Sequence, residues 1–201
     1  MNYPEFFDSI APIRLYDPLA EFLGSFSDGL IEFSYTDVVK AAGHSCPTVA
    51  GAYLMCQQGL TLLYPEQLPV RGQLKVEFKE TLEEGVAGVT ASVFTHITGA
   101  TDKSGFKGIN NNFIRHSLMA YECPITSSVR LSRIDNNKAI ELVYNPQIIP
   151  ASAEQQDLIQ LILNNKASDE QKIRFACLWQ VRVEKILCGS FFDNGILTIK
   201  I

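Results

Sequence analysis

The fold is decided by the stretch PTVAGAYLMCQQGLTLLY, residues 47–64. Pro47 suits the first position of a helix because it has no N–H to donate and its φ is already helical. The preceding Cys46 is then the cap residue. Apolar residues occupy almost every face of this stretch, and a helix that is apolar all round is buried. We therefore expect residues 47–64 to form the central helix of the molecule, with Pro65 ending it.

Shorter patterns on either side predict what surrounds this helix. Residues 73–79 alternate between polar and apolar side chains, which is typical of a half-buried strand. Residues 86–97 carry valines at helical spacing, although their Val and Thr content also suits a strand. Residues 129–134 and 138–144 flank a turn-forming Asp-Asn-Asn and predict a hairpin. The remaining expectations are short helices in residues 4–24, a strand at 30–35, a helix at 36–42 and a strand at 117–122.

The last third of the chain changes character. Residues 151–165 and 168–187 predict two helices, the second of which begins with a capping box of Ser168 and Gln171. Residues 196–201 are a candidate closing strand. The sequence therefore predicts an α+β fold in which a mixed or antiparallel sheet packs with helices and a C-terminal helical hairpin follows. We expect an α+β domain over residues 1–145 that carries the chemistry, and a helical extension with the closing strand over residues 146–201.

Composition and charge exclude several classes of protein. The chain has 201 residues, of which 46% are hydrophobic and 19% are charged. These values are typical of a globular protein and not of a disordered one. With 17 basic and 22 acidic residues the net charge is −5, so the basic footprint of a nucleic-acid-binding protein is missing. No apolar run approaches the ~20 residues that span a bilayer.

The cysteines and the first residues favour a cytoplasmic location. The five cysteines are an odd number without the spacing of a disulfide scaffold. The N-terminal residues show neither the basic nor the apolar segment of a signal peptide. We therefore expect free thiols in the cytoplasm, with neither a nucleic acid nor a membrane as a partner.

The strongest candidate for chemistry is the stretch AGHSCP, residues 42–47. The chain has 3 histidines, and His44 lies two residues before Cys46 at the start of a buried helix. The N-terminal end of a helix carries about half a positive charge, which favours a thiolate there. An imidazole and a thiolate on one loop suit zinc, nickel or iron. The alternative is a capping cysteine beside a hydrogen-bonded histidine.

A second candidate lies later in the chain. His96 falls near the end of the predicted helix 86–97, from where it could reach the first loop as a third metal ligand. The alternative is a histidine favoured by the negative end of the helix dipole. The glycine-bearing loop at residues 99–108 is not a Walker motif, because its glycine spacing is wrong. Its Lys103 and Lys107 would hold an anionic group of a ligand, or else are simply solvated.

Two segments together resemble the FmdE family, which is named after a component of formylmethanofuran dehydrogenase. Residues 43–47, GHSCP, resemble the family's Gly-His-x-Cys-Pro-Gly segment. Residues 97–108, ITGATDKSGFKG, resemble its Leu-Thr-Gly-Cys-Thr-x-Gly-Lys-Gly segment. The resemblance covers about residues 15–130. It implies a mixed α+β domain, often a dimer, with a metal ion bound near the His-x-Cys loop.

The chain departs from that family in two ways. The family's cysteine in the second segment is Ala100 here, so a second thiolate is missing and His96 would have to replace it. Many members end in a cysteine-rich zinc module, whereas this tail has only Cys177 and Cys188. The chain also lacks the cysteine sets that iron–sulfur clusters require. On its own it therefore cannot run the redox reaction of that enzyme.

The first functional hypothesis is a metal-binding protein of this family. His44, Cys46 and His96 would hold one divalent ion, with zinc as the first choice and nickel or iron as alternatives. In its enzymatic form the ion would act on a small anionic substrate that Lys103 and Lys107 orient. The sequence assigns no catalytic residue.

Two other hypotheses remain open. The chain would be a non-catalytic component or interaction module, a homodimer or part of a larger complex, if the apolar stripe within residues 175–186 is a docking surface. The same stripe would otherwise pack onto the chain's own sheet. Alternatively, the chain would be a thiol redox protein that uses Cys46 as its nucleophile.

Overall fold

The computed structural model describes residues 2–189 and 195–201, so residues 190–194 of the predicted C-terminal extension lie outside it. Its elements, in chain order, are η1 (Glu5–Ser9), β1 (Ile13–Tyr16), α1 (Pro18–Phe22), β2 (Leu30–Phe33), α2 (Tyr35–Ala42), α3 (Pro47–Leu63), β3 (Leu74–Phe78), α4 (Ala87–Thr98), β4 (Met119–Ala120), β5 (Val129–Arg133), β6 (Ala139–Tyr144), η2 (Pro146–Ile148), α5 (Ala153–Leu163), α6 (Asp169–Cys188) and β7 (Leu197–Lys200). The predicted α+β class is confirmed.

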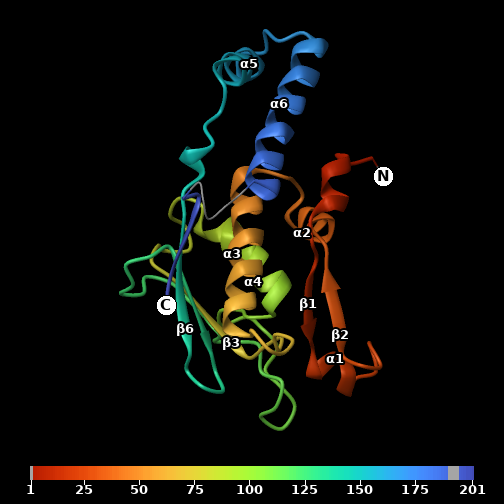
Figure 1. The fold of residues 1–201 in the computed structure, drawn as a ribbon, viewed down its shortest axis with the longest axis vertical. Helices are drawn as coiled ribbons and strands as arrows, with labels where there is room; N and C mark the ends of the chain where they lie inside the picture. Colours follow the sequence, from red (N-terminus) through yellow and green to blue (C-terminus); the bar gives the residue numbers. More distant parts are fainter. Residues whose placement is uncertain (1, 190–194) are drawn as a thin grey trace.

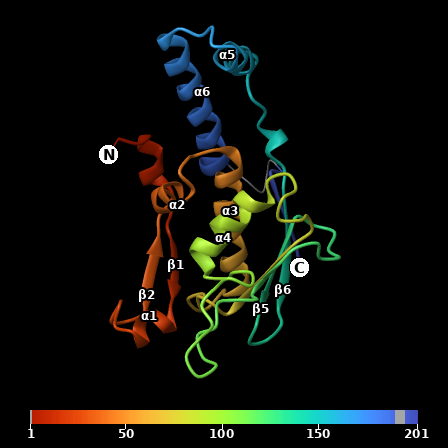
Figure 2. The ribbon, with the colours of Figure 1, turned by 180° about the vertical axis from the view of Figure 1, so that it is seen from behind.

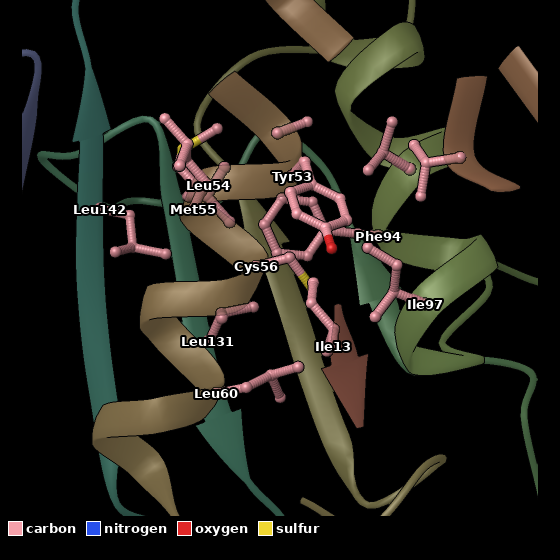
Figure 3. Packing of buried hydrophobic residues seen from close by; sticks show 14 of the residues in the cluster. Ile13, Tyr53, Leu54, Met55, Cys56, Leu60, Phe94, Ile97, Leu131 and Leu142 are labelled. Atoms are coloured by element: carbon pink, nitrogen blue, oxygen red, sulfur yellow. The ribbon is translucent and has the colours of Figure 1, made fainter. Parts of the chain in front are cut away.

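Helix α3 is the centre of the molecule, as its sequence predicts (Figure 1). Figure 3 shows how its side chains fill the space between two layers. Leu131 and Leu142 reach it from the sheet, and Phe94 and Ile97 reach it from α4 on the other side. Burial of large apolar side chains on both sides of one helix is the main favourable contribution to folding here. The other helices and strands are arranged around this one element.

The main sheet is mixed and has five strands in the order β4-β3-β5-β6-β7. Strand β3 pairs with β4 in parallel, and the other neighbours pair antiparallel. The predicted strand 73–79 and the hairpin 129–144 are confirmed, whereas the predicted strand 117–122 shrinks to Met119–Ala120. Because β7 pairs with β6, the end of the C-terminal extension is built into the main sheet.

The N-terminal residues contain a strand that the sequence pattern did not predict. Residues 4–24 hold not only short helices but also β1, which pairs antiparallel with β2. Ile13 and Leu15 are buried and Arg14 between them is exposed. Alternation over four residues is too short a signal to separate from the flanking helical patterns. The expectation of helices alone was therefore wrong for this segment.

Helices α5 and α6 form the predicted hairpin, with the Ser168–Gln171 capping box in place. Both ribbon views show the hairpin projecting from the body (Figures 1 and 2). The inner end of α6 packs on α3, with Val183 and Ile186 fully buried. The apolar stripe of residues 175–186 therefore packs on helix α3 at this end. Ile173, near the outer end, is 66% exposed.

A buried carboxylate joins the N-terminal segment to the rest of the molecule. Asp17, at the end of β1, is 3% exposed. Its Oδ1 accepts hydrogen bonds from Leu19 N (3.0 Å), Ala20 N (3.2 Å) and Arg115 Nη2 (2.6 Å). Its Oδ2 accepts one from Arg71 Nη1 (2.9 Å). These four bonds use the full accepting capacity of a carboxylate.

The two arginines carry this contact onto α4 and the loop that follows it. Arg71 donates from Nε to Ile97 O (2.9 Å) and from Nη2 to His96 O (3.0 Å), two carbonyls at the negative end of the α4 dipole. The Arg115 guanidinium lies against Gly99, where a Cβ atom would come within 2.9 Å of Nη1. Gly99 also has φ +73°, so a side chain is disfavoured there for two reasons.

Asp17→Asn should lower the free energy of unfolding by about 3–5 kcal/mol at pH 7, because the buried Arg115 and the half-buried Arg71 lose the carboxylate that they share. Burial raises the pKa of Asp17, but the hydrogen bond from Arg71 and the charge of Arg115 outweigh it, so the pKa lies below its ordinary value. The stabilisation is therefore complete above about pH 4 and is lost as the pH falls through the depressed pKa.

Urea unfolding across the acid range measures this contribution. The wild type should lose stability on acidification more steeply than Asp17→Asn. Asp169→Asn, which breaks a pair whose carboxylate is 88% exposed, is the control and should change stability little. Equal stabilities of Asp17→Asn and wild type at pH 7 would contradict this account.

Candidate functional site

The His-x-Cys loop lies between α2 and α3. Helix α2 ends at Gly43, which is left-handed with φ +77°, and Cys46 is the N-cap of α3. His44 is exposed, and its Nδ1 lies 3.0 Å from the carbonyl oxygen of Ala42. Cys46 is half-buried, and its Sγ accepts a hydrogen bond from Val49 N at 3.4 Å. These contacts match the alternative interpretation, a capping cysteine beside a hydrogen-bonded histidine.

Ser45, between the two residues, is held from α6. Its carbonyl oxygen accepts a hydrogen bond from Trp179 Nε1 at 2.9 Å. Its hydroxyl donates to Gln180 Oε1 at 3.1 Å and lies 3.0 Å from the hydroxyl of Tyr35. No local sequence signal reports these contacts, because the α6 partners are 134 and 135 residues away. The loop backbone is therefore fixed in place while His44 remains exposed.

His96 lies in the last turn of α4, as predicted, and faces α2 and β2. Its ring contacts Phe33 edge-on, with ring centroids 5.0 Å apart. Burial and the positive charge of Arg71 lower the pKa of His96, against the opposing charge of Asp37. The imidazole is therefore neutral at pH 7. Among the residues that the structure describes, its buried Nε2 has no hydrogen-bond partner.

A cleft of about 360 Å³ runs along α4 and contains His96. The wall is formed by α4 and the loops on both sides of it, together with the end of α2 and the segment at β4. The lining residues are Ala41, Leu82, Gly88, Ala91, Ser92, Thr95, His96, Thr101, Asp102, Ser104, Met119 and Tyr121. Five of these carry hydroxyl groups and one is a carboxylate. The cleft thus combines a neutral imidazole, a carboxylate and hydroxyl groups over a partly apolar floor.

The loop after α4 carries polar groups of the cleft wall, and the backbone of Arg115 holds one of them, Thr101, in place. The Arg115 carbonyl accepts hydrogen bonds from Thr101 N (2.9 Å) and Thr101 Oγ1 (2.8 Å). Asp102 accepts hydrogen bonds from Ser104 N (2.9 Å) and Ser104 Oγ (2.7 Å). These bonds hold the pKa of Asp102 below its ordinary value, so the carboxylate is ionised at neutral pH.

Of the cleft residues on α4, the sequence analysis identified His96 and missed Ser92 and Thr95, although a signal for them exists. Ser92, Thr95 and His96 lie at helical spacing i, i+3 and i+4, so they share one face. That face is polar while the rest of α4 is buried. A polar stripe on an otherwise apolar helix is the pattern that could have identified them.

The predicted site residues are distributed over two regions. His44 and Cys46 are at the start of α3, and His96 is in the cleft. Within residues 2–189 and 195–201, no three His, Cys, Asp or Glu side chains are grouped closely enough to hold a metal ion. Lys103 and Lys107 are exposed, and neither belongs to the cleft wall. Metal binding and anion binding at these residues stay predictions.

No family model matches the chain, and no curated protein matches it. The resemblance to the FmdE family therefore stays a prediction from the two motifs. In the part of the chain that is described, no helix is both long and apolar enough to cross a membrane. All five cysteines are free thiols.

Proposed function

We propose that the cleft along α4 is the functional centre of this chain and that it binds a small, uncharged polar molecule. The observation that carries this proposal is the convergence of His96 with Thr101, Asp102 and Ser104 on one cavity of about 360 Å³. This volume is within the range of small-molecule sites. A few polar groups over an apolar floor also agree with the usual composition of such sites.

The charges of the cleft indicate which ligands it accepts. The ionised Asp102 repels anions, which argues against the anionic substrate expected from Lys103 and Lys107. A neutral imidazole has one donor and one acceptor nitrogen, and because Nε2 of His96 is buried, the ring offers a ligand one hydrogen bond. The hydroxyls of Thr101 and Ser104 already donate to Arg115 O and Asp102 Oδ1, so they offer acceptor lone pairs to a ligand. A neutral ligand with several hydroxyl, amide or ring-nitrogen groups is therefore complementary to this wall, and His96 is the group that would exchange a proton with it.

His96→Ala should weaken binding of such a ligand about tenfold, because one side-chain hydrogen bond to the ligand is lost. Thermal-shift experiments on the purified wild type and variant measure this binding. The neutral probes are ribose, uracil and nicotinamide, and the anionic probe is malate. Neutral probes should raise the melting temperature more than malate does. Because the pKa of His96 is depressed, binding should hold from pH 8 through the ordinary histidine pKa of about 6.5 and weaken only as the pH falls through the depressed value.

His116→Ala is the matched control, since it removes a histidine outside the cleft wall. It should leave the ligand-induced shift unchanged. An undiminished shift in His96→Ala, or a shift that malate alone produces, would exclude this function for the cleft.

A second candidate function, which we infer from the loop of residues 43–47, is binding of a divalent transition metal. The observation that favours it is the contact between His44 Nδ1 and the Ala42 carbonyl. A carbonyl only accepts, so Nδ1 carries the proton and Nε2 keeps its lone pair. Histidines that ligate metals usually donate their other ring N–H in this way. Cys46 would supply a thiolate, which suits zinc, nickel or iron together with imidazole.

These two donors are fewer than the four ligands of a closed zinc site. Solvent or a second copy of the chain would have to complete the coordination. That requirement links the metal hypothesis to the predicted homodimer. An ion held in this way would keep an open position for a ligand or for a bound hydroxide.

Elemental analysis of the chain, purified without a histidine tag or a chelator, tests this second function. Near-stoichiometric metal should be present in the wild type and lost in His44→Ala and Cys46→Ala. His116→Ala should keep its metal, and His96→Ala should keep it as well if α4 supplies no ligand. Full metal content in His44→Ala, or none in the wild type, would reduce the loop to a capping role.

A further inference from the structure

A second cavity, separate from the cleft, lies between the first turns of α3 and α4 and the face of the sheet. Its volume is about 190 Å³. Met55 of α3, Phe78 of β3 and Val129 of β5 give it apolar walls. For comparison, an apolar cavity of about 150 Å³ can hold benzene. The space therefore suits a molecule of the size of one six-membered ring with a small head group.

One wall of this cavity is the ring of Tyr144, which packs closely against Gly51 of α3. Tyr144 lines the cavity and donates a hydrogen bond from its hydroxyl to Pro47 O at 2.7 Å. A Cβ atom at Gly51 would overlap the Tyr144 ring, so only glycine lets the ring lie this close to α3. With the hydroxyl bonded and the ring against the helix, this wall is fixed before any ligand arrives. A preformed wall lowers the cost of binding.

A threonine of α4 supplies a polar residue to this cavity. Thr90 of α4 is 6% exposed and lines the cavity. Ser92 and Thr98 on the same helix donate to the carbonyls of Gly88 (3.0 Å) and Phe94 (2.7 Å), one turn earlier. Thr90 makes no side-chain hydrogen bond to the residues that the structure describes. The Thr90 oxygen is not among the fully buried unpartnered side-chain atoms, so an acceptor group of a molecule in the cavity can reach this hydroxyl.

Two helix ends add partial positive charge to the same space. Thr48 in the first turn of α3 and Ala87 in the first turn of α4 both line the cavity. Neither first turn contains an acidic residue, and Val86, the N-cap of α4, offers no side-chain cap. Helix N-terminal ends of this kind favour acceptor groups. Glu80 also lines the cavity, so a full negative charge on the ligand is opposed.

We propose that this cavity is a binding site for a small apolar molecule that carries an uncharged carbonyl oxygen. The apolar walls take the body of the molecule, and the Thr90 hydroxyl donates to its carbonyl. Glu80 makes the site prefer the uncharged carbonyl to a carboxylate of the same shape. The site does not depend on the cleft, because the two cavities share no lining residue.

Fragment binding followed by NMR of the ¹⁵N-labelled full chain tests this proposal. Benzamide, benzoate and toluene share one body and differ in the head group. Benzamide should bind most tightly and shift the amide signals of Thr48, Ala87 and Ser128. Thr90→Val should weaken benzamide about tenfold, the effect of one lost hydrogen bond, and leave toluene unchanged. Glu80→Gln should raise the affinity for benzoate and leave that for benzamide unchanged.

Thermal unfolding of Thr90→Val separates binding from folding. Since the hydroxyl has no partner among the described residues, the variant should melt at or above the wild-type temperature. Absence of benzamide-induced shifts at these three amides at millimolar concentration would overturn the proposal. Equal benzamide affinities of the wild type and a folded Thr90→Val would overturn it too. A clear preference for benzoate over benzamide in the wild type would overturn the assigned role of Glu80.

Discussion

The cleft depends on one buried carboxylate. Asp17 uses all four of its acceptor positions on the first turn of α1 and on two arginines. Arg71 holds the last carbonyls of α4, where His96 lies, and Arg115 holds Thr101 through its own carbonyl. His96 and Thr101, two polar residues of the cleft wall, are therefore both positioned by Asp17, which lies outside the cleft. The positive charge of Arg71 also adds to the effect of burial in depressing the pKa of His96.

The two motifs that the sequence suggested as one site lie in two neighbouring regions, joined by the end of α2, whose Ala41 lines the cleft. The His-x-Cys loop lies at the N-terminal end of α3, under α6, and the cleft lies along α4. The chain therefore offers two places for chemistry, each of which has its own support. The loop is fixed by Trp179 and Gln180 of the projecting hairpin. A change in the position of α6 would therefore alter the hydrogen bonds of Ser45 first.

The sequence was sufficient for elements with a clear period or a cap. The all-round apolar pattern predicted α3, and Pro47 predicted where it begins. Ser168 and Gln171 likewise predicted the start of α6. What the sequence could not predict was contact between distant residues. Asp17 meets Arg115 across 98 positions and Arg71 across 54, and neither pair has a local pattern. The sequence analysis missed the short strand β1 for a related reason, because this segment becomes a strand by pairing with β2.

The candidate site likewise combines residues that local sequence patterns predicted with contacts that they could not predict. The location of His96 at the end of a helix followed from valine spacing, and Cys46 as a cap followed from Pro47. The proximity of His96 to Thr101 and Asp102 depends on how the loop folds back, which Arg115 decides. The expected meeting of His44 with His96 at one metal ion stays a prediction, because it depends on contact between two motifs that are distant in the sequence.

Amide hydrogen exchange of Arg115→Met tests the central claim most directly. This variant leaves Asp17 paired with Arg71, so the fold should persist without an unbalanced buried charge. Exchange should accelerate at Thr101, whose N–H is bonded to the Arg115 carbonyl, and over residues 99–118. Amides of α5 and the outer end of α6 should exchange as in the wild type. Unchanged protection at residues 99–118 would show that the cleft wall does not depend on the carboxylate network.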